Sequence, residues 1–164
     1  MIPLHEAQEA VLAGCKPLTP VQVAYSEMTG RVLAQDVVAT EDVPPFSNTA
    51  VDGYAVRASD TEQTPVELVV VDTLAAGAEP KIAVNAGEAI RIMTGAPMPA
   101  GADAVVMVED TQRVGETHVR ISRSAKVHDG VRDAGSDVRA GETVFVPGTV
   151  MNAAGVGVLA SVNA

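Results

Sequence analysis

Aromatic residues, cysteine and positive charge are all scarce in this sequence of 164 residues. It has no tryptophan, two tyrosines and two phenylalanines, so aliphatic side chains, with valine prominent, must fill the interior. Because β-branched residues suit a pleated sheet better than a helix, this composition favours strands. Fourteen glycines and ten prolines, spread along the chain, supply frequent turns. The chain is therefore expected to fold as a mainly β globular protein.

Charge and cysteine content exclude several classes of function. The formal net charge is -10, and no Lys/Arg cluster offers local attraction to phosphates, so a nucleic-acid partner is not expected. The single Cys15 cannot form an internal disulfide, which fits a reducing cytoplasm. His5, Glu6 and Glu9 interrupt the N-terminal segment where a signal peptide needs an apolar core, and no apolar run reaches membrane-spanning length. We expect a cytoplasmic protein that binds neither nucleic acid nor membranes.

Hydrophobic periodicity and turn signals predict two helices and several strands. Apolar residues at helical spacing predict a helix over residues 4–13, ended by Gly14 and Pro17. Asn152 is placed to cap a closing helix over residues 153–162. The remaining predicted elements are strands over 21–23, 31–39, 54–56, 65–74, 89–93, 104–109 and 143–147, one turn capped by Ser26, and a hairpin around Gly115.

The stretch FSNTAVDGYAVR, residues 46–57, admits a structural and a functional interpretation. It follows Pro44-Pro45 and contains the step Asp52-Gly53, which suits a stiffened loop and a tight reversal. Local pattern alone favours this structural interpretation. An aspartate in an exposed loop is nevertheless ionised at neutral pH. Asp52 would then suit a Mg²⁺ ion that is held by one or two carboxylates and substrate phosphates.

A second stretch, RIMTGAPMPAGADAVVMVED at residues 91–110, places Thr94 before Gly95 at the end of a predicted strand. Glycine lacks a Cβ and therefore lets a ligand or another backbone approach closely. Thr94 would then exchange hydrogen bonds with a ligand in a pocket lined by loops. The simpler interpretation, which the pattern alone favours, is a Gly/Pro loop between two strands.

A third stretch, HDGVRDAGSDVRAGE at residues 128–142, carries Asp129, Asp133 and Asp137 at four-residue intervals. The glycines between them oppose a helix that would present the carboxylates together, and like charges at that spacing on a helix repel. A solvated acidic loop is therefore favoured over a metal cage made by the protein alone. Arg132 would recognise phosphate or carboxylate through its planar guanidinium group.

Taken together, these stretches resemble the molybdopterin molybdenumtransferase family of the MoeA and gephyrin E-domain type. Residues 46–57 resemble its FDNSAMDGYAVR signature, residues 91–109 its RIMTGAPLPxGADAVVxxE segment, and residues 135–137 its GED step. The matches follow in the right order across nearly the whole chain. Ser47 and Ser136 stand where the family has Asp and Glu, so the region offers fewer possible metal ligands.

The resemblance implies an enzyme that transfers molybdate to adenylylated molybdopterin and releases AMP, with Mg²⁺ taking part. Asp52 would be catalytic, as a group that binds the metal or orients molybdate. Thr94 would be both catalytic and substrate-binding, donating a hydrogen bond to a bound oxyanion or phosphate. Arg132 would hold substrate anions. Asp137 would be catalytic by positioning the metal, a water molecule or Arg132.

The resemblance also implies an α+β, mainly β architecture with a discontinuous first domain. Residues 1–45 and 140–164 would form that domain, with its N-terminal helix, and residues 46–139 a β-rich inserted domain. The family's pterin-binding domain, on which the first helix would pack, and its last domain are expected to be absent here. Family members are elongated homodimers with active sites shared between subunits, so this chain would supply one wall and be inactive alone. The alternative is a noncatalytic interaction or scaffold module of the gephyrin type.

Overall fold

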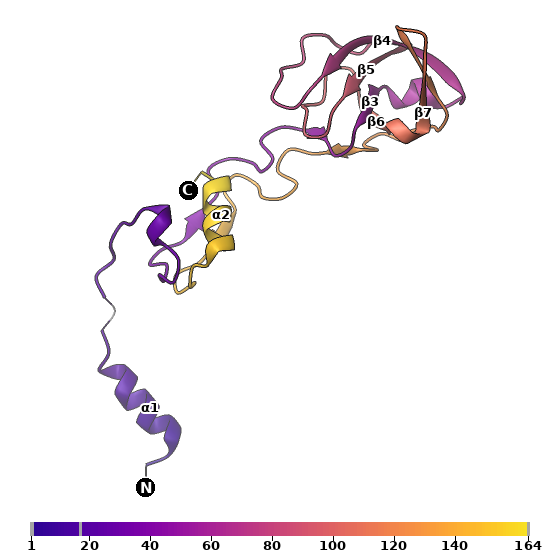
Figure 1. The fold of residues 1–164 in the computed structure, drawn as a ribbon. Helices are drawn as coiled ribbons and strands as arrows, with labels where there is room; N and C mark the ends of the chain where they lie inside the picture. The colour runs from indigo at the N-terminus through magenta and orange to yellow at the C-terminus, as the bar shows by residue number, and fades with distance from the viewer. Residues whose placement is uncertain (1, 17, 164) are drawn as a thin grey trace.

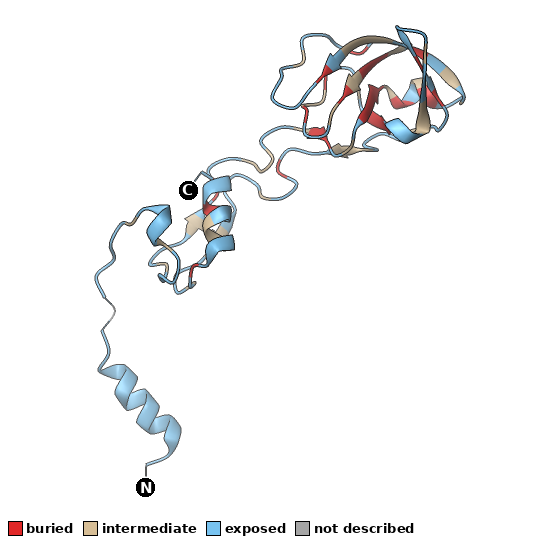
Figure 2. Cartoon of the chain, in the orientation of Figure 1, coloured by how far each residue is buried: buried red, intermediate tan, exposed pale blue. Residues whose placement is uncertain are grey.

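The computed structural model of the chain describes residues 2–16 and 18–163. Figure 1 shows an N-terminal helix, a small region built from segments near both ends of the chain, and a strand-rich region built from its middle part. Figure 2 shows that the buried residues gather mainly in the strand-rich region. The prediction of an α+β, mainly β fold with a β-rich insertion is confirmed.

The first helix, α1, spans Leu4–Ala13, the limits that the sequence predicts. It ends at Gly14, whose N–H donates to the carbonyl of Val11 at 3.1 Å. Pro17, the second part of the predicted stop signal, lies outside the described residues. α1 buries none of its residues (Figure 2). Neither α1 nor any other helix in the described part of the chain is long and apolar enough to cross a membrane.

Two short strands form in the small region. β1, Val37–Val38, pairs antiparallel with β10, Thr143–Phe145, so β10 is two residues shorter than predicted. The strand predicted over residues 31–39 is wrong in its extent. Val32 makes only an isolated bridge to Val150, and a bend at residues 34–35 separates that bridge from β1.

Near the N-terminus, one local prediction is wrong and a second is correct only in part. The strand predicted over residues 21–23 does not form, because alternating valines do not make a strand without a partner to pair with. The turn predicted at Ser26 is present as the 3₁₀-helix η1, Tyr25–Glu27, but it begins one residue earlier. Its N-cap residue is Ala24, and no side chain caps it.

The closing helix, α2, spans Ala153–Ser161 and confirms the prediction to within one residue. The Asn152 side chain caps it as predicted, accepting a hydrogen bond from the N–H of Gly155 at 2.8 Å. At the other end, the carbonyl of Val162 accepts a 3.1 Å hydrogen bond from the Thr40 hydroxyl. This contact joins the segment that follows β1 to the end of α2 within the small region.

A six-stranded sheet forms the strand-rich region (Figure 1). Its order is β6-β3-β5-β4-β8-β7, and every neighbouring pair is antiparallel except β4 and β5. The strand limits are β3 Gly53–Val56, β4 Val66–Leu74, β5 Glu88–Ile92, β6 Ala104–Met107, β7 Thr111–Val114 and β8 His118–Ile121. The hairpin predicted around Gly115 is therefore confirmed as β7 and β8. Two 3₁₀-helices, η2 Ala58–Thr61 and η3 Val108–Asp110, follow β3 and β6.

Both faces of this sheet carry apolar side chains. In β3, Tyr54 and Val56 belong to one core cluster, with Leu68, whereas Ala55 belongs to a second, with Ile90. This division follows from the two-residue period of a strand, which sends successive side chains to opposite faces. Packing on both faces fixes the register of β3 against its neighbours, and thereby the position of the residue just before it.

Two chain segments connect the small region to the sheet region, and they pair with each other. Val43 bridges Val138, and the N–H of Gly135 donates to the carbonyl of Pro44 at 2.9 Å. Further along, β2, Asn48–Thr49, pairs antiparallel with β9, Val131–Arg132. The predicted limits at residues 45/46 and 139/140 fall near this paired connection and stay a prediction.

Candidate functional site

Asp52 and Thr94 lie at the same end of the pair formed by β3 and β5. In this antiparallel pair Gly53 stands opposite Ile92. Asp52 comes directly before β3, and Thr94 is the second residue after β5. The pairing of two strands far apart in the sequence therefore brings the two predicted site residues together.

The carboxylate of Asp52 binds Thr94 directly. Both the backbone N–H and the hydroxyl of Thr94 donate to the same oxygen, Oδ1 of Asp52, each at 2.7 Å. Hydrogen bonds to an ionised acceptor are shorter and stronger than those between neutral groups. The second oxygen, Oδ2, has no partner among the described residues, and both residues are exposed. The pair thus presents one free carboxylate oxygen to solvent.

These contacts stabilise the ionised form of Asp52. The backbone N–H of Thr94, and then its hydroxyl, hold the pKa of the Asp52 carboxyl below its usual range. Desolvation acts in the opposite direction, and the positive charge of Arg91 adds to the lowering. Asp52 is therefore a carboxylate at neutral pH.

Glycines shape the backbone on both sides of this pair. A Cβ at Gly53 would collide with the carbonyl of Val106 in β6, so only glycine fits there without displacement of the sheet. Gly95, directly after Thr94, has φ +81°, which glycine adopts without steric cost. Both ends of the Asp52–Thr94 contact therefore depend on glycine.

Arg132 is linked to the same end of the sheet through β2. It stands opposite Asn48 in the pairing of β9 with β2. The neighbouring Thr49 holds the loop after Thr94, because the carbonyl of Thr49 accepts from Gly95 N–H at 2.9 Å. The Arg132 side chain is exposed and makes no hydrogen bond or ion pair with the described residues. Its guanidinium group is therefore available to an anion.

Among the described residues, no side-chain contact connects Asp137 to the other three candidates. It belongs to the connection between the two regions, where its N–H donates to the carbonyl of Val43 at 2.9 Å. Within residues 2–16 and 18–163, its side chain makes no hydrogen bond or ion pair with Asp52, Thr94 or Arg132. The structure thus joins Asp52 to Thr94 directly and Arg132 to them through the backbone, and it does not join Asp137 to the group.

The chain by itself offers few ligands to a metal ion. Among the described residues, no group of three or more His, Cys, Asp or Glu side chains could hold a metal ion. Asp52 contributes one free oxygen. That single oxygen fits a Mg²⁺ ion only if water and substrate phosphate oxygens supply its other ligands, which is a common arrangement for this ion.

Arg91 is a neighbour of Asp52 that the sequence interpretation missed. Its Nη1 donates to the carbonyl of Gly53 at 3.1 Å, and its Cζ lies 5.1 Å from the centroid of the Tyr54 ring. Arg91 is partly buried. Its closeness to Asp52 follows from its place in β5, directly opposite Tyr54. The local sequence pattern does not reveal which strands pair, so it could not indicate this neighbour.

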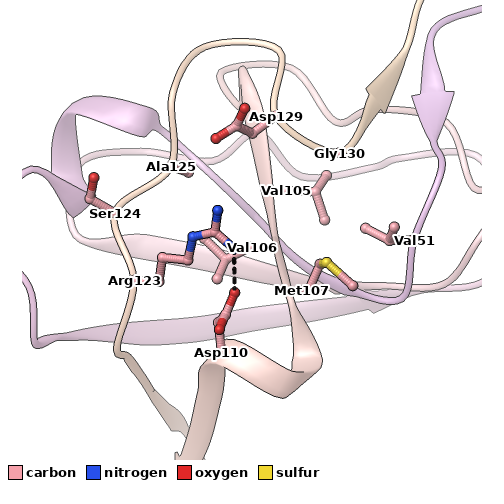
Figure 3. Close-up of a pocket in the computed structure, with 10 residues that line it drawn as sticks. All are labelled: Val51, Val105, Val106, Met107, Asp110, Arg123, Ser124, Ala125, Asp129 and Gly130. Atoms are coloured by element: carbon pink, nitrogen blue, oxygen red, sulfur yellow. Dashed lines mark hydrogen bonds and ion pairs between the residues drawn. The ribbon is translucent and has the colours of Figure 1, made fainter.

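A small cavity of about 250 Å³ lies on the sheet region (Figure 3). Within it, Arg123 and Asp110 form a loose ion pair of 3.4 Å. The four predicted site residues are not among those that line it, although Val51 next to Asp52 is. Its lining residues are Val51, Val105, Val106, Met107, Asp110, Arg123, Ser124, Ala125, Asp129 and Gly130.

Comparison with known proteins identifies the family. The family model described as the MoeA N-terminal region (domain I and II) matches residues 2–163, and the chain belongs to this family. Among its relatives are a molybdopterin molybdenumtransferase of Staphylococcus epidermidis, 34% identical over 164 residues, and molybdopterin molybdenumtransferase 2 of Mycobacterium tuberculosis, 40% identical over 162 residues. The chain is also similar to the crystal structure of the molybdopterin biosynthesis MoeA protein from Pyrococcus horikoshii OT3, with a TM-score of 0.94 and 36% identity.

These similarities cover nearly all of this chain but less than half of each relative. The matches take in 98% and 96% of this chain for the two curated relatives and 99% for the crystal structure. The corresponding shares of the other proteins are 39%, 40% and 44%. The relatives' names therefore describe activities of longer proteins.

Proposed function

We propose that the chain is the N-terminal part of a molybdopterin molybdenumtransferase, which transfers molybdate to adenylylated molybdopterin and releases AMP. The observation that carries this proposal is the direct contact between Asp52 and Thr94. These residues come from the two longest stretches that resemble the family. The names of the Staphylococcus and Mycobacterium relatives, molybdopterin molybdenumtransferase and molybdopterin molybdenumtransferase 2, support a transfer of molybdenum to molybdopterin.

In this reaction Asp52 would bind Mg²⁺ or orient molybdate through its free oxygen, Oδ2. The other oxygen is already occupied by Thr94, so the direction of the carboxylate is set before any ligand arrives. Such preorganisation avoids reorientation of the group when charge develops. When bound, Mg²⁺ would neutralise charge on phosphate and leaving-group oxygens.

The geometry favours a holding role for Thr94 over direct contact with substrate. Its only hydroxyl proton is donated to Asp52, and a threonine hydroxyl has a single proton to give. Donation to a bound oxyanion would therefore require loss of that hydrogen bond. Arg132, whose guanidinium is uncommitted, is the better candidate for holding substrate anions.

Asp137 would act from the connection between the two regions, by positioning a metal ion, a water molecule or Arg132. We propose that residues 1–45 and 140–164 form one domain and residues 46–139 the inserted domain. The active protein would be a cytoplasmic homodimer, in which another subunit's domain completes the site. Residues 1–164 alone would then be inactive.

The test is to replace the matched region of the Mycobacterium tuberculosis relative with residues 1–164 of this chain. The chimera is incubated with adenylylated molybdopterin, Mg²⁺ and molybdate, and AMP release is measured. We expect release that depends on molybdate, and none from residues 1–164 alone. A chimera that unfolds cooperatively and forms dimers, yet releases no AMP where the unaltered relative does, would contradict the proposal. A chimera that binds protein partners without any effect of the pterin would favour the scaffold alternative.

A further inference from the structure

Arg91 lies close to Asp52, near the start of β3. It stands opposite Tyr54 in the antiparallel pairing of β5 with β3, and residues opposite each other share a face. Asp52 lies in the bend directly before β3, close enough for the positive charge of Arg91 to act on its carboxylate. The residue opposite Arg91, Tyr54, is thus two positions after Asp52 in the chain.

The contacts of Arg91 fix the peptide between Gly53 and Tyr54, one residue beyond Asp52. Its Nη1 donates to the carbonyl of Gly53 at 3.1 Å, and the guanidinium group packs on the Tyr54 ring at 5.1 Å. The carbonyl of Asp52 itself accepts a 3.0 Å hydrogen bond from the N–H of Val108. Two successive carbonyl groups, at Asp52 and Gly53, are therefore fixed from two different elements.

The hydrogen bonds to these two carbonyl groups matter because one of the two residues is a glycine, Gly53. A side chain is sterically excluded at this position, yet glycine has more backbone freedom than any other residue. Gly53 is paired with β5 and β6, and the hydrogen bond from Arg91 adds a side-chain constraint at the same position. A planar guanidinium group held by an aromatic face and a carbonyl is a stiff constraint, because it loses less freedom per hydrogen bond than a lysine ammonium group.

The position of Arg91 also leaves the carboxylate accessible. No ion pair among the described residues involves Arg91, so it does not cover the free oxygen of Asp52. Its charge nevertheless favours the ionised form of this carboxylate. Arg91 therefore supports Asp52 without competing for the oxygen that a ligand would use.

We propose that Arg91 is a positioning residue. It holds the carbonyl of Gly53, and with it the start of β3, so that Oδ1 of Asp52 meets both donors of Thr94, while Oδ2 stays open to a metal ion or oxyanion. This inference rests on the proposed function, because the value of an open Oδ2 depends on a metal ion or oxyanion binding there. Its geometric content can be tested in residues 1–164 without any substrate.

The experiment compares Arg91→Met and Arg91→Lys with the native chain by NMR. Arg120→Met is the matched control, because Arg120 is also a sheet arginine with a side-chain hydrogen bond, of 2.7 Å to Glu67. The probe is the backbone amide of Thr94, through its proton chemical shift and its hydrogen exchange. The amides of Ile90 and Val119 report on the stability of the sheet.

In Arg91→Met we expect the Thr94 amide proton to move upfield and to exchange about 10-fold faster, the effect of weakening a hydrogen bond to a charged acceptor. Arg91→Lys should give a partial effect, and Arg120→Met none at Thr94. An unchanged Thr94 amide in Arg91→Met would overturn the proposal. So would an equal rise in exchange at Ile90 and Val119, because Arg91 would then serve sheet stability alone. Either result leaves the proposed transfer reaction to be judged by the chimera, so the two failures are distinguishable.

Discussion

Oδ1 of Asp52 accepts two hydrogen bonds of 2.7 Å from one residue, Thr94, which lies 42 positions later in the chain. One of these bonds comes from the backbone N–H of Thr94 and does not depend on the Thr94 side chain. The other depends on the threonine hydroxyl. The two contributions can therefore be separated by mutation.

Thr94→Val removes the hydroxyl and keeps the shape of the side chain. The pKa of Asp52 should rise but stay below its usual range, because the backbone N–H is the larger cause of the lowering. Carbonyl NMR of the Asp52 side chain during an acid titration measures this. Thr111→Val is the control, since its hydroxyl donates to a backbone carbonyl, that of Val108. A Thr94→Val protein with an unchanged Asp52 pKa would contradict the assigned role of the hydroxyl.

The lowered pKa of Asp52 also predicts how stability depends on pH. A carboxyl whose folded pKa lies below its unfolded value of about 3.9 adds stability that is fully present above that value. The stability is lost as the pH falls through the folded pKa. The native chain should therefore melt at a higher temperature than Asp52→Asn at pH 7, and the gap should close in acid. If the difference in melting temperature between the two proteins were the same at pH 7 and at a pH below the folded pKa, ionisation of Asp52 would not contribute to the stability of the fold.

Gly53→Ala and Gly157→Ala should have opposite effects on stability. The first adds a Cβ against the carbonyl of Val106, and displacing packed backbone should cost about 1–3 kcal/mol. The second adds a Cβ into open space within α2, where Ala is favoured over Gly by about 1 kcal/mol. Urea unfolding measures both. Equal destabilisation by the two changes would contradict the close approach of β3 and β6.

Removal of residues 1–14 should leave the melting temperature of the remaining chain nearly unchanged, because α1 buries none of its residues. Leu159→Ala is the contrasting change. Leu159 is the buried residue of α2, and truncation of a buried leucine typically costs about 2–5 kcal/mol. Calorimetry of the two proteins checks this. A large fall in melting temperature on removal of residues 1–14 would mean that α1 packs on the rest of the chain.

Local signals predicted the elements whose stabilising contacts are local. Asn152 bonds three residues along the chain, and the hairpin at Gly115 joins neighbouring strands. The predicted strand at residues 21–23 failed because its formation depends on a partner that no local pattern reveals. Sequence periodicity identifies strand formers, whereas pairing is decided by the whole fold.

The same limit applies to the candidate site. Asp52 and Thr94 were selected through the family resemblance, and local pattern alone favoured a turn and a loop. Their contact depends on the pairing of β3 with β5, two strands separated in the chain by β4. Arg91 was missed for this reason, since its neighbours Gly53 and Tyr54 reach it only through that pairing.

The most direct test of the central claim is the effect of Asp52→Asn on molybdate-dependent AMP release by the chimera. Asp110→Asn is the matched control, because Asp110 is another carboxylate of the sheet region and is ion-paired with Arg123 instead of hydrogen-bonded to Thr94. We expect Asp52→Asn to lower the rate by about 10- to 100-fold, the usual effect of losing a group that binds or orients a metal, and Asp110→Asn to leave it unchanged. A folded Asp52→Asn chimera that releases AMP at the unaltered rate would contradict the claim that this carboxylate serves the transfer.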